Sequence, residues 1–204
     1  MNYFLGVELN GSRLKIAAFK KNGQVLELIK LESLNLSNES NEASKELTNW
    51  INRSLTEPTS VKAVLTVSES TLYIKELEFP KIPQEKINEA VYWEIPSIAP
   101  VPQSDAVYDW QITSNTKDGS KILVIVGKNS SIQNLILTFR NAQIDVVAIE
   151  PSSHAFARIA NAPFDTNTLV CLVEEQGTDF IILKNGMPHF TTSTTGSTQS
   201  EVVS

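Results

Sequence analysis

The residues Leu5–Phe19 constrain the fold more than any other stretch of the chain. An apolar segment runs into a polar turn that contains Gly11 and Ser12, and a second apolar segment follows. Two apolar segments around a short polar turn are typical of a β-hairpin. The pattern therefore predicts paired strands over residues 3–8 and 14–20.

The hairpin is followed by a third strand, a helix and a buried strand. Asn22-Gly23 is a strong turn signal, so residues 24–33 are expected to pair as a third strand. Apolar residues recur at close to a 3.6-residue period over 42–55, which predicts a helix. Val61–Val67 is almost continuously apolar and suits a central strand. This order of elements predicts an α/β fold.

The pattern changes after Ser68. A helix is expected to open at Pro83 and to stop at Pro96. Three prolines are then expected to form a stiff linker: Pro96, Pro100 and Pro102. The elements expected downstream are strands 107–112 and 121–126, a helix capped by Ser130 or Ser131, strand 144–149, a helix through Ala160, and strands 168–173, 180–183 and 188–192. The tail Thr191–Ser204 is expected to be disordered or an unpaired edge.

Composition excludes several classes of protein. The 204 residues carry a formal net charge of -6, which argues against a nucleic-acid binder with a basic face. No apolar run approaches the roughly 18–20 residues that span a bilayer, and the N-terminus does not read as a signal peptide, so a cytoplasmic location is expected. Cys171 is the only cysteine, so an internal disulfide is impossible, and its apolar neighbours predict a buried thiol.

Several segments, in this order and spacing, resemble a known family. They are Leu77–Pro83, Ile87–Pro96, Ala106–Trp110, Val146–Arg158 and Ile182–Phe190, together with the first hairpin. The chain resembles the actin-like type IV pilus assembly proteins of the PilM type. It is also similar to the related cytoplasmic part of the type II secretion protein GspL and to the pilus biogenesis protein MshI.

The resemblance implies a fold and a domain organisation. The fold would be α/β, an actin-like (ribonuclease H-like) half with an inserted small α+β subdomain. Residues 1–67 would form the first part of the core and residues 68–150 the inserted subdomain. Residues 151–204 would hold the return helix and the start of the second actin-like half, with a disordered tail.

The resemblance also implies a phosphate-binding first hairpin, in which Gly11, Ser12 and Lys15 would face the phosphates. The family pattern has aspartate and glycine where this chain has Glu8 and Asn10. A plain hairpin turn is the competing interpretation. The second phosphate loop should carry an Asp-x-Gly pattern, but here it contains three carboxylates, which would repel phosphates. They are Glu174, Glu175 and Asp179. We therefore expect no bound cofactor, with ATP as the open alternative.

The function that the resemblance implies is scaffolding without catalysis. The chain would lie at the cytoplasmic face of the inner membrane and bind the short N-terminal tail of a bitopic PilN-type partner. The tail would occupy a groove between the core and the inserted subdomain. The expected partner-binding residues are Phe79, Ile82, Trp93 and Ile95.

Other interpretations stay open at this point. The aromatic residues Tyr92, Trp93, Tyr108 and Trp110 fit either core packing or a peptide groove. An actin-like ATP-binding protein of the cell-division or filament type is the alternative function. A sugar-kinase-like enzyme would need a catalytic aspartate from a second half. Neither His154 nor His189 has a second ligand at metal spacing. Glu174 and Glu175 could form a metal or acid–base pair, but adjacent strand residues point to opposite faces. No serine has the context of a nucleophile, so no metal site and no catalytic residue are expected.

Overall fold

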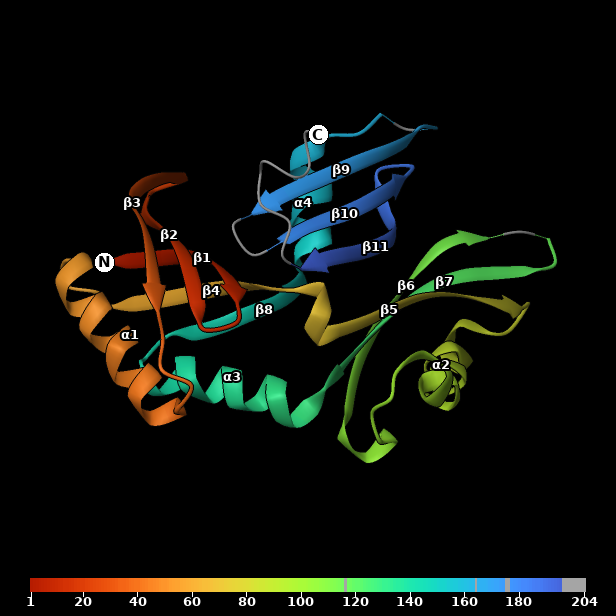
Figure 1. Cartoon of the computed structure of the whole chain (residues 1–204), viewed down its shortest axis with the longest axis horizontal. Coiled ribbons are helices and arrows are strands. Elements are labelled where there is room, and N and C mark those ends of the chain that lie inside the picture. The colour runs from red at the N-terminus through yellow and green to blue at the C-terminus, as the bar shows by residue number, and fades with distance from the viewer. Residues whose placement is uncertain (116, 164, 175–176, 196–204) are drawn as a thin grey trace. The chain divides into compact units, whose positions relative to one another are not determined.

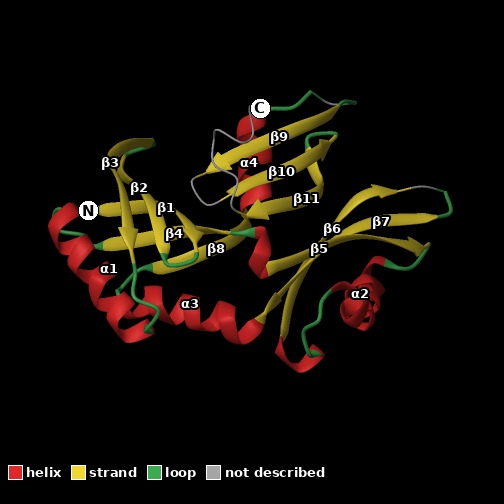
Figure 2. Cartoon of the chain, in the orientation of Figure 1, coloured by secondary structure: helices red, strands yellow, loops and turns green. Residues whose placement is uncertain are grey.

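The computed structural model describes residues 1–115, 117–163, 165–174 and 177–195. The chain divides into two compact units. Unit 1 consists of Met1–Ser68 and Ile132–Ala155, and unit 2 consists of Glu69–Ser131 and Phe156–Ser204. Figure 1 labels the helices and strands, and Figure 2 colours them by type.

Unit 1 is built on one mixed sheet with the strand order β3-β2-β1-β4-β8. β1, β2 and β3 pair antiparallel, whereas β1 pairs parallel with β4, and β4 pairs parallel with β8. The bounds of these strands are β1 Asn2–Asn10, β2 Arg13–Asn22, β3 Val25–Asn35, β4 Ser60–Val67 and β8 Asp145–Pro151. An antiparallel three-stranded start followed by parallel strands is the ribonuclease H-like arrangement.

Two helices cover one face of this sheet, α1 (Ser40–Ser54) and α3 (Asn129–Asn141). Alternate residues of the strands point to this face and are buried. Trp50 of α1 and Phe139 of α3 pack into the same core. The strand residues in that core are Tyr3, Leu5, Val7, Leu14, Ile16, Ala18, Val61, Ala63 and Leu65. The amphipathic period of 42–55 and the alternation of the hairpin therefore meet in one apolar layer.

Unit 2 contains an antiparallel sheet with the order β5-β7-β6, covered on one face by α2. Its elements are the short helix η1 Glu69–Thr71, β5 Leu72–Pro80, α2 Gln84–Ile98, the short helix η2 Gln103–Asp105, β6 Ala106–Asn115 and β7 Gly119–Lys128. Ile87, Val91 and Ile95 of α2 are buried against Ile122 and Val124 of β7. These three helix positions lie four residues apart, which places them on one face of the helix.

A second antiparallel sheet of unit 2 has the order β11-β10-β9. Its strands are β9 Asn167–Glu174, β10 Gly177–Lys184 and β11 Met187–Thr195. Helix α4 (Ser152–Ala160) contributes Phe156 and Ala157 to the core on this sheet. Val170 and Leu172 of β9 pack against that core.

The structure corrects two expectations about β9 and β11. Cys171 is exposed, so the prediction of a buried thiol is wrong. It lies between the inward-facing Val170 and Leu172, and successive strand residues point to opposite faces. The first part of the expected disordered tail is wrong too, because residues 191–195 pair with β10. Residues 196–204 lie outside the described residues.

Two further differences concern the region around residues 68–150. The expected segment ended at 150, whereas the structure places Ile132–Ala155 in unit 1, where β8 pairs with β4. Helix α2 was expected to stop at Pro96 but continues through it to Ile98, so Pro96 is not part of a linker. That 68–150 forms a separable subdomain stays a prediction.

The expected cap of α3 also differs. Helix α3 begins at Asn129, and the carboxylate of Asp105 lies at its first turn. The Ser130 N–H donates to Asp105 Oδ1 at 2.8 Å, and Ser130 Oγ donates to Oδ2 at 2.9 Å. A carboxylate satisfies the free N–H groups of a helix start well, so the capping group is Asp105, with Ser130 as its donor.

Candidate functional site

The first hairpin closes through a tight turn. Asn10 lies opposite Arg13, so Gly11 and Ser12 alone form the loop. Gly11 has φ 60°, which glycine adopts at little cost, and both loop residues are exposed. The backbone carbonyl of Ser12 accepts a hydrogen bond from the Leu36 N–H at 2.8 Å. The geometry is that of a short hairpin turn anchored to the end of β3.

Lys15 of this hairpin is paired with Glu8. The two residues lie directly opposite each other on β2 and β1, and Lys15 Nζ lies 3.3 Å from both carboxylate oxygens of Glu8. Both side chains are partly exposed. Glu8 is therefore the ion-pair partner of Lys15 across the hairpin.

The segment expected to form a second phosphate loop falls partly outside the described residues. Residues 175–176, which include Glu175, lie outside them, as does the side chain of Glu174. Gly177, Thr178 and Asp179 belong to strand β10, and Thr178 is buried. Among the described residues, no three His, Cys, Asp or Glu side chains are grouped to bind a metal ion.

Two of the four expected partner-binding residues, Trp93 and Ile95, lie on different faces of helix α2. Ile95 is fully buried, with 0% exposure, and packs in the core against β7. Trp93 is 67% exposed. Two residues that are two positions apart on a helix lie on nearly opposite sides, so Ile95 cannot share a surface with Trp93. Core packing is thus wrong for Trp93, and Ile95, which was expected to contact the partner, is a core residue instead.

Phe79 and Ile82 take intermediate positions. Both are partly buried against the core under α2. Phe79 also lines a shallow hollow of about 280 Å³ where β5 ends and β7 begins, together with Pro80, Gly119 and Lys121. Gly119 is needed there, because a Cβ at this residue would collide with the Phe79 carbonyl oxygen. Phe79 is therefore partly accessible and Ile82 mainly supports the core.

Trp93 belongs to a cluster of aromatic side chains, which we call the α2 aromatic cluster: Tyr92, Trp93, Tyr108 and Trp110. The Tyr92 and Trp93 rings meet edge-on, with centroids 5.4 Å apart and planes at 73°. The Tyr92 and Tyr108 rings lie 6.5 Å apart. Such pairs contribute about 0.5–1.5 kcal/mol beyond their buried area. Trp93 is the most exposed member of the cluster, and its ring contact is with Tyr92.

Asn88 of α2 binds the two members of the cluster that lie on β6, and it was not singled out from the sequence. Its side-chain oxygen accepts a hydrogen bond from Trp110 Nε1 at 3.3 Å. Its backbone carbonyl accepts one from the Tyr108 hydroxyl at 3.5 Å. No local pattern marks Asn88, because its partners are about twenty residues away in the chain. These bonds fix the aromatic rings of β6 against α2.

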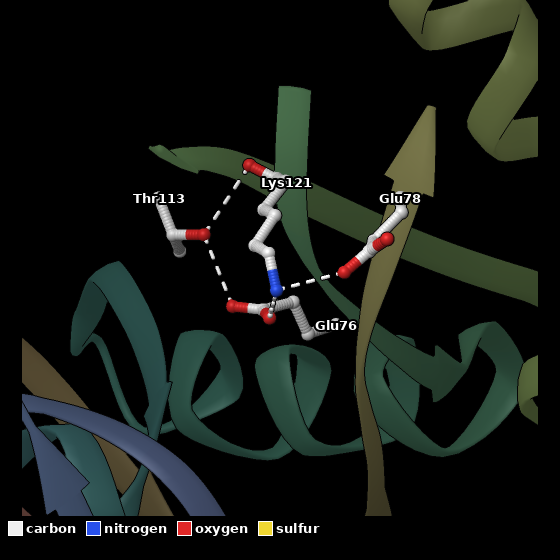
Figure 3. A network of polar contacts seen from close by, with 4 residues as sticks. All are labelled: Glu76, Glu78, Thr113 and Lys121. Carbon is white, nitrogen blue, oxygen red and sulfur yellow. Dashed lines mark hydrogen bonds and ion pairs between the residues drawn. The ribbon is translucent and has the colours of Figure 1, made fainter. Parts of the chain in front are cut away.

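The opposite face of the β5-β7-β6 sheet carries a charged network, shown in Figure 3. Lys121 Nζ lies 2.7 Å from Glu78 and 3.4 Å from Glu76, and Thr113 Oγ1 donates to Glu76 at 3.1 Å. The hydrogen bond from Lys121, and then its charge, lower the pKa of Glu78 from the ordinary value of 4.5. Glu78 in turn raises the pKa of Lys121. This exposed network is an ordinary solvated ion cluster.

The class of protein follows from three features of the fold: the strand orders, the paired helices and the inserted antiparallel sheet. The chain is a mixed α/β protein with the actin-like, ribonuclease H-like fold, as the sequence predicted. No protein-family model matches the chain, and no curated protein matches it by sequence. No helix in the described ranges is long and apolar enough to cross a membrane.

The solved structures that are similar to the chain include a PilM and an EpsL domain. PilM in the PilM-PilN type IV pilus biogenesis complex superposes with a TM-score of 0.76 at 20% identity, over 96% of this chain and 62% of that one. The cytoplasmic domain of EpsL, an inner membrane component of the type II secretion system of Vibrio cholerae, superposes with a TM-score of 0.64 at 12% identity, over 95% of this chain and 71% of that one. The chain thus spans less than two thirds of the length of that PilM chain.

Proposed function

We propose that this chain is a scaffold component of a type IV pilus or type II secretion assembly platform. In this role it binds the short cytoplasmic tail of a PilN-type inner-membrane protein at the cytoplasmic face of that membrane. It belongs to the PilM type and performs no catalysis. The observation that carries the proposal is the α2 aromatic cluster, in which Trp93 is 67% exposed on a helix whose other face is buried.

The cluster has the properties of a peptide anchor. Tryptophan and tyrosine are enriched among the residues that dominate binding energy at interfaces. The Tyr92 ring packs against Trp93 and the Tyr108 ring packs against Tyr92, so the indole can be presented with little loss of side-chain entropy on binding. Phe79 adds a partly accessible aromatic ring at another point of unit 2.

The type of partner is suggested by the structural likenesses. The PilM chain was solved in complex with PilN, and the EpsL domain is the cytoplasmic part of an inner membrane component. Both superpose on nearly all of this chain. A PilN-type tail is therefore the first ligand to test.

An ATP-binding role has less support from the hairpin. Lys15 is paired with Glu8 across the strands, and the turn consists of two residues. A phosphate at this turn would have to displace the Glu8 carboxylate or lie beside it, which is electrostatically unfavourable. We therefore propose that scaffolding needs no nucleotide and no other cofactor.

The test is tail binding measured by fluorescence anisotropy, with a labelled N-terminal peptide from a PilN-type protein. We expect saturable binding to the intact chain and a loss of affinity of about tenfold or more in Trp93→Ala, since a central aromatic anchor contributes on the order of 2 kcal/mol. Phe190→Ala is the matched control, because Phe190 is also an exposed aromatic side chain but lies on β11.

Two results would contradict the proposal. One is unchanged tail affinity in a Trp93→Ala protein whose circular dichroism matches the wild type. The other is an equal loss of affinity in Phe190→Ala, which would show that any exposed aromatic residue on unit 2 has the same effect.

A further inference from the structure

Strand β3 is an edge strand with a strongly apolar surface. Within the described residues it pairs with β2 alone, so its outer backbone groups face away from the sheet. Five large apolar side chains along it are between 37% and 68% exposed: Val25, Leu26, Leu28, Ile29 and Leu31. Edge strands are usually kept from pairing by prolines, by several charges or by their short length. β3 has eleven residues and no proline.

A bulge in the middle of β3 determines which side chains share a face. Phe19 lies opposite Leu28 and Ala18 opposite Lys30, so Ile29 is an extra residue on β3. Because of this extra residue, Glu27 and Lys30 point to the same face of the sheet although they are three positions apart. Leu26, Leu28 and Leu31 point to the other face.

We propose that β3 pairs antiparallel with β3 of a second copy of this chain, so that two five-stranded sheets become one continuous sheet. The dyad lies between Leu28 and Ile29. In this register Glu27 faces Lys30 of the second copy and Leu26 faces its Leu31, each pair occurring twice. This dimer does not depend on tail binding at α2, so either proposal can fail alone.

This register is selected by the side of the sheet to which each side chain points. Residues opposite each other in an antiparallel pair project on the same side of the sheet. In a regular strand, Glu27 and Lys30 would point to opposite faces, and the pairing would be excluded. The bulge removes that conflict for both copies, and it also matches Leu26 with Leu31.

Charge complementarity favours a second copy over an unrelated strand. β3 carries three charged residues, and two of them, Glu27 and Lys30, lie symmetrically about the dyad. Opposite charges directly across two strands are stabilising and like charges are destabilising. Sliding the second copy by two residues would place Glu27 opposite Glu32, which is unfavourable.

Lys30 can take part without leaving a buried group unpaired. Its Nζ lies 3.6 Å from Glu32, but Glu32 has two shorter contacts within unit 1. Trp50 Nε1 donates to Glu32 at 3.0 Å, and the Arg53 guanidinium donates at 2.6 Å. Glu32 therefore stays satisfied when Lys30 turns towards Glu27 of the second copy.

The test is sedimentation equilibrium of the full chain from micromolar to near-millimolar concentration. Reductant is included, because the exposed Cys171 could otherwise link two copies. We expect the apparent mass to rise from 22.5 kDa towards twice that value, about 45 kDa. Glu27→Lys and Lys30→Glu each replace two attractive pairs by two repulsive ones, so each should weaken dimerisation about tenfold or more.

Mixing the two variants gives the decisive result. Glu27→Lys carries two lysines at the paired positions and Lys30→Glu carries two glutamates, so together they form complementary pairs at both sites. We expect the mixture to recover the dimer. Lys45→Glu, an exposed charge reversal on α1, should dimerise like the wild type. A single 22.5 kDa species at every concentration, or a dimer that survives both single variants, would overturn the proposal.

Discussion

Gln103 Nε2 donates a hydrogen bond of 3.0 Å to the backbone carbonyl oxygen of Tyr92. Tyr92 is the residue whose carbonyl would accept the helical N–H of Pro96, and proline has no N–H. The side chain of Gln103 therefore replaces the backbone donor that Pro96 removes. This substitution explains how α2 runs through Pro96 to Ile98 and keeps Trp93 and Ile95 in helical register.

We predict that Gln103→Ala destabilises the protein because it leaves the Tyr92 carbonyl to water. The cost should be about 0.5–1 kcal/mol, since this bond is exposed and one hydrogen bond contributes on that order. Urea unfolding followed by circular dichroism measures it. The cost should vanish in a Pro96→Ala background, where residue 96 regains an N–H for Tyr92. Equal costs in both backgrounds would show that Gln103 acts through another contact.

Trp93 and Ile95 should respond in opposite ways to truncation. Ile95→Ala removes a fully buried side chain and should cost about 2–4 kcal/mol of unfolding free energy. Trp93→Ala removes an exposed side chain whose main contact is the Tyr92 ring, and it should cost no more than about 1 kcal/mol. Chemical denaturation of the two variants side by side makes the comparison. If Trp93→Ala were as unstable as Ile95→Ala, Trp93 would have to be a core residue.

The ion pair between Glu78 and Lys121 should be visible in a titration. Lys121 lowers the pKa of Glu78 below 4.5, so the pair stabilises the fold above that pH and the contribution is lost as the pH falls through the folded pKa. In Lys121→Met the pKa of Glu78 should rise towards 4.5, measured by the carboxyl carbon shift in NMR. Lys81→Met, another exposed lysine, is the control and should leave it unchanged.

The first hairpin should not bind nucleotide. Isothermal calorimetry with ATP and magnesium should give no binding heat, because Glu8 neutralises Lys15 and the turn is short. The result that would contradict this is a dissociation constant of about 10 μM or tighter, roughly −7 kcal/mol. Binding of that strength, lost in Lys15→Ala, would favour the ATP-binding alternative.

The candidate site was only partly predictable from sequence. The aromatic residues around α2 were identified, but their environments were not, because helix 84–98 could present either Trp93 or Ile95 to the core until the position of β7 was known. Asn88 and Gln103 act through partners eleven or more residues away. In a helix that runs through Pro96, the sequence shows that the Tyr92 carbonyl lacks its backbone donor. It does not show that Gln103 supplies the replacement donor.

The sequence by itself determined the local elements: the first two hairpins, helix α1, the central strand β4 and the α/β class. These depend on turn residues and on apolar periods of two or 3.6, which act within a few residues. Tertiary structure alone decided that β8 pairs with β4 and so draws Ile144 into unit 1. It also decided that a bulge at Ile29 reorders the faces of β3. Such outcomes depend on strand register and on contacts between distant segments, which no local pattern encodes.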